Sequence, residues 1–182
     1  MIKKRLFSLA VIVLCLSVAG GGTLAYFSDR TVAHNVITSG NIKIDLLETR
    51  ADGSTFENVI GVMPGASVEK VVQVKNIGDN DAWIRVRVEK ELTKANGQAG
   101  DADLLGINFD SRNWIARDGY YYYDKTLKSG DVTEPLFESV QFNASMGNDY
   151  QNSTAQVYVF AQATQTANNG ETVLEANGWP ED

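Results

Sequence analysis

The chain has 182 residues, 43% of them hydrophobic, and a formal net charge of −7 at pH 7. This length suits one domain with a sizeable core. The acidic balance repels phosphate backbones and anionic membrane surfaces, so we expect no nucleic-acid partner. The only cysteine, Cys15, lies in an N-terminal apolar stretch, and the rest of the chain therefore cannot form a disulfide.

Residues 1–25 are typical of an export signal. Three basic residues precede an apolar stretch over residues 6–19, which is too short for a comfortable membrane span and so disfavours an uncleaved anchor helix. Thr23 and Ala25 are small residues at the two positions that a signal peptidase reads. Cleavage is predicted between Ala25 and Tyr26, with the next bond as the alternative. It leaves 157 residues with a formal net charge of −10, because the signal carries three basic residues and no acidic one.

Residues 26–39, YFSDRTVAHNVITS, follow the predicted cleavage site and form a plausible extra strand. An extended segment of this kind can add to the open edge of a neighbouring sheet through main-chain hydrogen bonds. The alternation is imperfect, because Val36 and Ile37 are adjacent. We predict a donor strand whose apolar contacts come from Phe27, Val32, Val36 and Ile37.

Residues 40–182 show period-two alternation broken by turn residues, which is typical of half-buried strands. Lys70 breaks one of the apolar rows. The turn at residues 76–81 predicts that the strands on either side of it are antiparallel neighbours. Residues 94–106 predict a surface excursion with a short helical turn near residues 101–105. Strand candidates lie at residues 42–46, 68–74, 84–88, 119–124, 136–142 and 155–163. The spacing predicts an all-β fold, a two-layer antiparallel β-sandwich, with roughly seven to nine strands.

The run GGGTLAYFSD at residues 20–29, together with residues 63–88 and 119–142, resembles the TasA and camelysin family. The first block is similar to the family's processing region, with its pattern G-G-G-T-x-A-x-F-x-D. The resemblance implies export with a SipW-type signal peptidase, a jelly-roll version of the sandwich and assembly into extracellular matrix fibres. It also implies a conflicting function, because camelysin was named as a cell-surface metallopeptidase.

Enzyme chemistry has little support in the residues present. His34 is the only histidine, so the H-E-x-x-H zinc site cannot form, and no G-x-S-x-G sequence marks a nucleophile. The acidic pairs Asp79 with Asp81 and Asp101 with Asp103 favour Asx turns over a calcium site. We therefore assign no catalytic, metal or cofactor residue and predict that the protein is not an enzyme.

Four consecutive tyrosines, at residues 120–123, alternate between the two faces of a predicted strand. Core packing and β-propensity are the commonest explanation for such a run, and contact with another subunit is the main alternative. Tyr121 and Tyr123 beside Trp114 are candidates for an exposed surface that contacts another subunit or stacks on sugar rings.

These observations favour a secreted structural protein of the extracellular matrix or cell surface. After signal removal it polymerises head to tail by donor-strand addition into biofilm matrix fibres, so its main partner is a second copy of itself. Signal peptidase is a partner during export, an accessory matrix subunit is a possible further one, and no membrane partner remains after cleavage. The alternatives are a monomeric surface-binding module and a camelysin-like secreted metallopeptidase.

Overall fold

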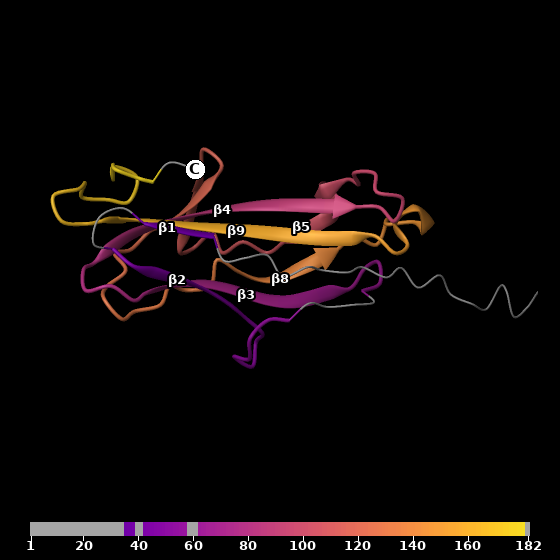
Figure 1. Cartoon of the computed structure of the whole chain (residues 1–182), viewed down its shortest axis with the longest axis horizontal. Helices are drawn as coiled ribbons and strands as arrows, with labels where there is room; N and C mark the ends of the chain where they lie inside the picture. The colour runs from indigo at the N-terminus through magenta and orange to yellow at the C-terminus, as the bar shows by residue number, and fades with distance from the viewer. Residues whose placement is uncertain (1–34, 39–41, 58–61, 181–182) are drawn as a thin grey trace, which may run out of the picture.

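A computed structural model describes residues 35–38, 42–57 and 62–180, which form two packed β-sheets (Figure 1). The signal peptide, whose apolar core we expect to be a helix separate from the sandwich, lies outside these residues. Within the described ranges, no helix has the length and apolar character needed to cross a membrane. The two helical turns are short 3-10 segments at Ala102–Leu104 and Asn148–Tyr150, and the first confirms the turn expected near residues 101–105.

The first sheet has five strands in the order β1-β9-β4-β7-β6. Its centre is a long antiparallel ladder that runs from the pair Ala82 and Gln165 to the pair Thr93 and Thr154. β1 pairs with β9 in parallel, so this edge departs from the antiparallel pattern. The strands are β1 (Asn35–Thr38), β4 (Ala82–Thr93), β6 (Trp114–Arg117), β7 (Tyr120–Tyr123) and β9 (Thr154–Gln165).

The second sheet has four strands in the order β2-β3-β8-β5, all antiparallel. The register of β3 against β8 shifts between Glu69 and Val72, as a β-bulge requires. Asn108 caps the irregularity, since its Oδ1 accepts hydrogen bonds from two successive backbone amides of β8. The strands are β2 (Ile44–Thr49), β3 (Ser67–Asn76), β5 (Leu105–Ile107) and β8 (Phe137–Phe142).

The chain crosses between the sheets after β1, β3, β4, β5, β7 and β8, which is the interlaced connectivity of a jelly roll. The predicted β-sandwich is thus confirmed. One local prediction was wrong: β3 and β4 are not hydrogen-bonded neighbours but lie in different sheets. The turn between them is held instead by Asn76, whose Nδ2 donates to the carbonyls of Asn80 and Leu127 across the gap.

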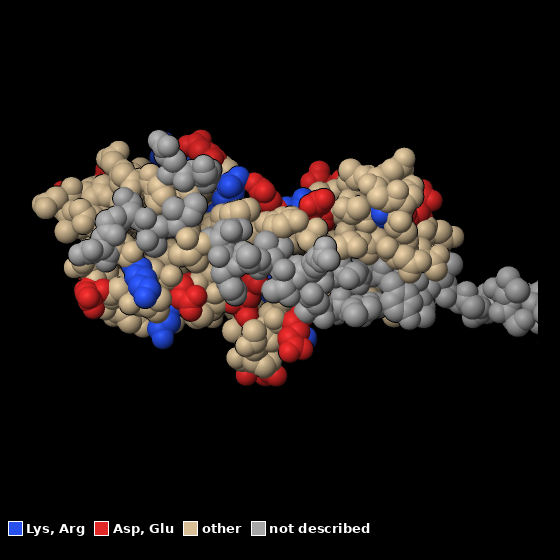
Figure 2. All heavy atoms as spheres, in the orientation of Figure 1, with Lys and Arg blue, Asp and Glu red and all other residues tan. Residues whose placement is uncertain are grey.

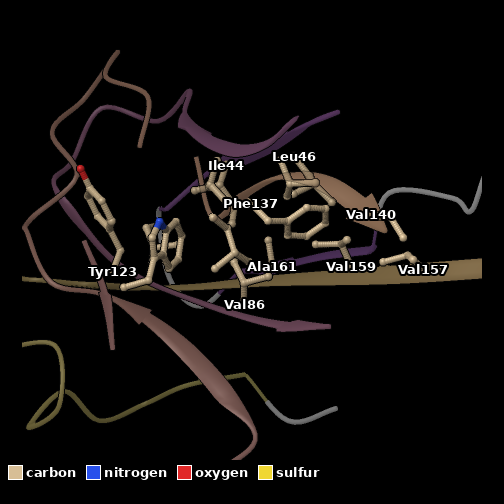
Figure 3. Close-up of a cluster of buried hydrophobic side chains, with 14 of the residues drawn as sticks. Ile44, Leu46, Val86, Tyr123, Phe137, Val140, Val157, Val159 and Ala161 are labelled. Carbon is tan, nitrogen blue, oxygen red and sulfur yellow. The ribbon is translucent and has the colours of Figure 1, made fainter. Parts of the chain in front are cut away.

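The core lies between the two sheets and follows from the alternation of apolar residues along each strand (Figure 3). Each fully buried Val, Leu, Ile or Phe side chain contributes roughly 1.5–3 kcal/mol by leaving water. The side chains labelled there from the four-stranded sheet are Ile44, Leu46, Phe137 and Val140, and those facing them from β4 and β9 are Val86, Val157, Val159 and Ala161.

A second, smaller cluster covers the outer face of the five-stranded sheet, where the chain returns after β9. We call residues 166–180 the C-terminal strap. Val173 and Ala176 of the strap pack with Trp83 and Tyr122 of the sheet. Trp83 Nε1 also donates a hydrogen bond to a strap carbonyl, that of Asn169, at 2.9 Å. The strap therefore forms a partial third layer.

Candidate functional site

The edge of the five-stranded sheet at β9 is only partly covered. β4 pairs with all twelve residues of β9 on one side. On the other side β1 pairs only with Phe160–Ala163. Within the described residues, Thr154–Val159 therefore have no strand partner on that side. Unpaired main-chain groups along a strand edge are a template for another strand.

The inner wall beside this open stretch is apolar. Ala155, Val157 and Val159 point into the core and are buried. β1 and β2 are edge strands of opposite sheets and contact each other, so they lie on the same side of the sandwich. A strand added along Thr154–Val159 would thus extend the line of β1 and lie beside β2.

The facing sheet carries a buried ion pair on β2 and β3. Lys70 Nζ lies 3.0 Å from Glu48 Oε1, and the two side chains are only 6% and 10% exposed. The Lys70 ammonium also lies 4.4 Å from the centre of the Phe56 ring, which covers it. Lys70 faces inward with Val72, next to the bulge in β3.

Figure 3 shows how β2 runs relative to β9. Ile44 and Leu46 succeed each other along β2 in the direction that leads from Ala161 to Val157 along β9. Glu48 is the next inward-facing residue of β2 after Leu46, because it pairs with the buried Val72 of β3. Glu48 therefore follows Leu46 on the inward face of β2.

The predicted donor segment is split by the described ranges. Phe27, Val32 and the cleavage residues Thr23, Ala25 and Tyr26 lie outside them. Val36 and Ile37 lie in β1, and Val36 is half-buried against the core. The end of the segment is thus a strand of its own sandwich, although residues 26–39 were predicted as a separate donor unit.

The prediction that Trp114, Tyr121 and Tyr123 form an exposed surface is wrong. Trp114 and Tyr123 are core residues with 2% and 4% exposure, and Tyr121 stacks on Phe109 with a ring-centre distance of 4.1 Å. The alternation of the run is confirmed, but Tyr121 and Tyr123 take the inner face. Tyr122 on the outer face is covered by the strap. The sequence signal for this cover, which the sequence analysis missed, is the pair of apolar strap residues Val173 and Trp179.

Hydrogen bonds tie these buried aromatics to Glu134. The Tyr123 hydroxyl donates to Oε2 of Glu134, and Lys125 Nζ contacts Oε1 at 2.6 Å. The hydrogen bonds from Lys125 and then Tyr123 hold the pKa of the Glu134 carboxyl below its usual value. Burial, followed by the carboxylate of Glu134, raises the pKa of Tyr123. The group therefore ties the end of β7 to the segment before β8 that carries Glu134.

No metal centre is assembled in the part of the chain that the structure describes, where His, Cys, Asp and Glu side chains form no group of three or more. His34 lies outside that part. The Asp101 carboxylate accepts a hydrogen bond from the backbone amide of Asp103 at 3.0 Å, as in the predicted Asx turn.

The fold and the edge define the class: a β-sandwich of jelly-roll connectivity with an incompletely paired edge strand. The sequence model of the family described as camelysin metallo-endopeptidase matches residues 1–109, more than half of the chain. The chain belongs to this family, which also includes TasA and whose members are secreted. Comparison with curated proteins gives no match, and neither does comparison with solved structures.

Proposed function

We propose that this chain is a secreted structural protein that polymerises into extracellular matrix fibres by head-to-tail strand addition after its signal peptide is removed. The observation that carries this proposal is the contrast along β9: β1 covers four residues, while Thr154–Val159 remain open among the described residues. The N-terminal segment of a second copy is the donor, and this β9 edge is the acceptor.

Domain swapping supplies a route to such an addition. β1 is the first described strand and lies at the edge of its sheet. It can leave β9 and be replaced by the identical segment of a neighbour with no change in the contacts made. A donor that also covers the open stretch adds backbone hydrogen bonds, each with a net value of roughly 0.5–1.5 kcal/mol. The exchanged strand would then be held by more hydrogen bonds than the four-residue pairing of β1 alone.

The geometry of the contact favours a filament over a closed dimer. A donor segment and an acceptor edge are different surfaces, so repeated addition is heterologous and extends until a rotation closes it. On the face seen in Figure 2, acidic and basic side chains occur in small groups of both signs. We therefore expect copies to be joined by strand pairing, with no nucleic-acid or membrane partner and with an accessory subunit only as an initiator.

The test compares three N-terminal truncations by negative-stain electron microscopy. The chain that begins at Tyr26 is expected to form fibres. The chain that begins at Gly40 lacks β1 and is expected to remain monomeric. The chain that begins at Asn35 keeps β1 but lacks the residues before it, so it is the matched control for the contribution of those upstream residues. Fibres from the Gly40 chain would refute the proposal. Mass spectrometry of the secreted protein should find an N-terminus at Tyr26, and one beyond Ile37 would also refute it.

A peptidase is the second candidate, favoured by the description of the family alone. Metal analysis with and without chelator, combined with a casein digest, separates it from the structural function. Chelator-sensitive casein cleavage by the purified chain would support the peptidase. The monomeric glycan-binding alternative loses its main support because Trp114 and Tyr123 are core residues.

A further inference from the structure

The central ladder of the five-stranded sheet is open on its other side as well. On the side away from β9, β7 pairs with Arg85 and Val86 of β4, and an isolated bridge joins Thr93 to Ala99. In the part of the chain that the structure describes, Val88–Glu91 have no strand partner on that side. The ladder therefore has two stretches to which a strand can add, one on β9 and one on β4.

The two open stretches present equivalent main-chain groups. The Leu92 carbonyl accepts a hydrogen bond from the Gly100 amide at 2.6 Å, on the side of β4 away from β9. Alternate residues of a strand direct their N–H and C=O groups to the same side, so Lys90 and Val88 share this direction. Val157, which is opposite Lys90, directs its own groups to the open side of β9. Main-chain pairing alone therefore does not select between the two edges.

The inward side chains of the two stretches differ in charge. Lys90 faces inward opposite the buried Val157. Its ammonium donates a hydrogen bond at 2.9 Å to the carbonyl of Leu105, in strand β5 of the facing sheet, and lies 3.7 Å from the exposed carboxylate of Asp103. The other inward residues of these rungs are all apolar: Val88 and Leu92 on β4, and Ala155, Val157 and Val159 on β9. The β9 stretch thus has an apolar inner wall, whereas the β4 stretch has a cation in it.

A strand added along Val88–Glu91 would have to bury this ammonium. The Lys90 side chain is still 28% exposed, and the inward side chains of a new neighbour would cover it. One of its three protons is bound by the Leu105 carbonyl, while the Asp103 carboxylate at 3.7 Å is beyond hydrogen-bond distance. Burial of a charge without a full set of partners is costly. Inward-pointing charges are accordingly one means by which natural sheets protect an edge from pairing.

The same ammonium also occupies part of a second edge. The Leu104 carbonyl accepts a hydrogen bond from the Asn143 amide on the β8 side, so alternation turns the Leu105 carbonyl to the open side of β5. Lys90 binds that carbonyl. One side chain therefore stands between two neighbouring edges, β4 in one sheet and β5 in the other.

We propose that Lys90 blocks strand addition along Val88–Glu91 and thereby confines assembly to the β9 edge. This inference rests on the proposed function and names a residue that determines its specificity. With one acceptor edge for each copy, head-to-tail addition gives an unbranched fibre. A second acceptor edge on β4 would let one subunit receive two donors.

Hydrogen exchange at single amides reads the two edges separately. The mature chain that begins at Tyr26 is assembled and then exchanged, with the Val157 amide as reporter of the β9 stretch and the Val88 amide as reporter of the β4 stretch. In the parent chain, we expect assembly to slow exchange at Val157 and not at Val88. In Lys90→Met, assembly should also slow exchange at Val88, by about tenfold or more, because the amide of a paired strand exchanges only when the pairing opens.

Control variants assign the effect to the charge at this position. Lys90→Arg keeps a long cation, and Lys128→Met removes an exposed charge in a turn, so both should exchange like the parent chain. Urea unfolding identifies a variant that fails to fold. Lys90→Thr repeats the test with a short, neutral side chain that strands favour.

The two reporters separate failure of this inference from failure of the proposed function. A Val88 amide that exchanges as fast in assembled Lys90→Met and Lys90→Thr as in the parent would overturn the inference, and so would a Val88 amide already slowed in the assembled parent. Slowed exchange at Val157 would leave the proposed function standing in either case. Exchange at Val157 that assembly does not change would overturn the proposed function, whatever is found at Val88.

Discussion

The buried ion pair of Lys70 and Glu48 provides the sharpest test of the packing within the four-stranded sheet. Replacing Lys70 with methionine keeps a long, flexible side chain under the Phe56 ring but leaves the Glu48 carboxylate in place without its partner. Both side chains are at least nine-tenths buried. Breaking a pair of this kind costs roughly 3–5 kcal/mol, since the remaining charge is buried and uncompensated.

The measurement is the free energy of unfolding of the mature chain from urea titration, followed by intrinsic tryptophan fluorescence. We expect Lys70→Met to lose about 3–5 kcal/mol, which for a domain of this size corresponds to a fall in Tm of about 10 °C or more. Adding Glu48→Leu should restore stability to the wild-type value or above it, because an apolar pair avoids the desolvation cost of the ions.

Lys75→Met is the matched control. Lys75 lies on the same strand but on the opposite face from Lys70, and it is only half-buried. Its replacement should change the free energy of unfolding by less than about 0.5 kcal/mol. If Lys70→Met were as stable as this control, or if the double variant were less stable than Lys70→Met alone, the reasoning about a buried, mutually dependent pair would be refuted.

Three further predictions concern the opposite sheet and its strap. The pKa of Glu134 is lowered in the folded state, so its contribution to stability is present above the usual value of 4.5 and is lost on acidification. In Glu134→Gln the urea midpoint should therefore fall less between pH 5 and pH 3 than it does in the wild type. An equal fall in the two proteins would contradict this. Trp179→Ala removes the ring 4.7 Å from the Arg85 guanidinium and should cost about 1–2 kcal/mol by thermal unfolding while leaving fibres intact; no loss of stability would contradict the packing of the strap. Gly170→Ala forces a Cβ to within 2.9 Å of the Glu175 carbonyl carbon at a backbone φ of +67°, so limited proteolysis should cut the strap faster than in wild type, and equal rates would count against this geometry.

The sequence was sufficient for the fold class because alternation is a local signal. In β9 the pattern of Val157 and Val159 against Tyr158 and Phe160 requires one buried face, and the structure confirms it. Strand pairing is not local, and the prediction that residues 68–74 and 84–88 are neighbours failed for that reason. The short turn suggested a hairpin, whereas Asn76 at the end of β3 binds Asn80 in the turn and Leu127, which in turn bridges to Ala82 of β4.

The candidate site was only partly predictable for a related reason. Lys70 was recognisable as a break in an apolar row, but its partner Glu48 lies on another strand and no pattern near Lys70 identifies it. The exposure of the tyrosine run was predicted wrongly because Tyr121 and Tyr123 face the core between the sheets. Trp179 returns from the far end of the chain to cover Tyr122 on the outer face. Which face of a strand is covered depends on such distant segments.

High-resolution electron cryomicroscopy of fibres grown from the chain that begins at Tyr26 tests the central claim most directly. The account predicts a continuous strand alongside Thr154–Val159, in parallel with β9, whose backbone connects to the neighbouring subunit. Density that connects instead to β2 of the same subunit, or an edge left empty in fibres held together elsewhere, would contradict it.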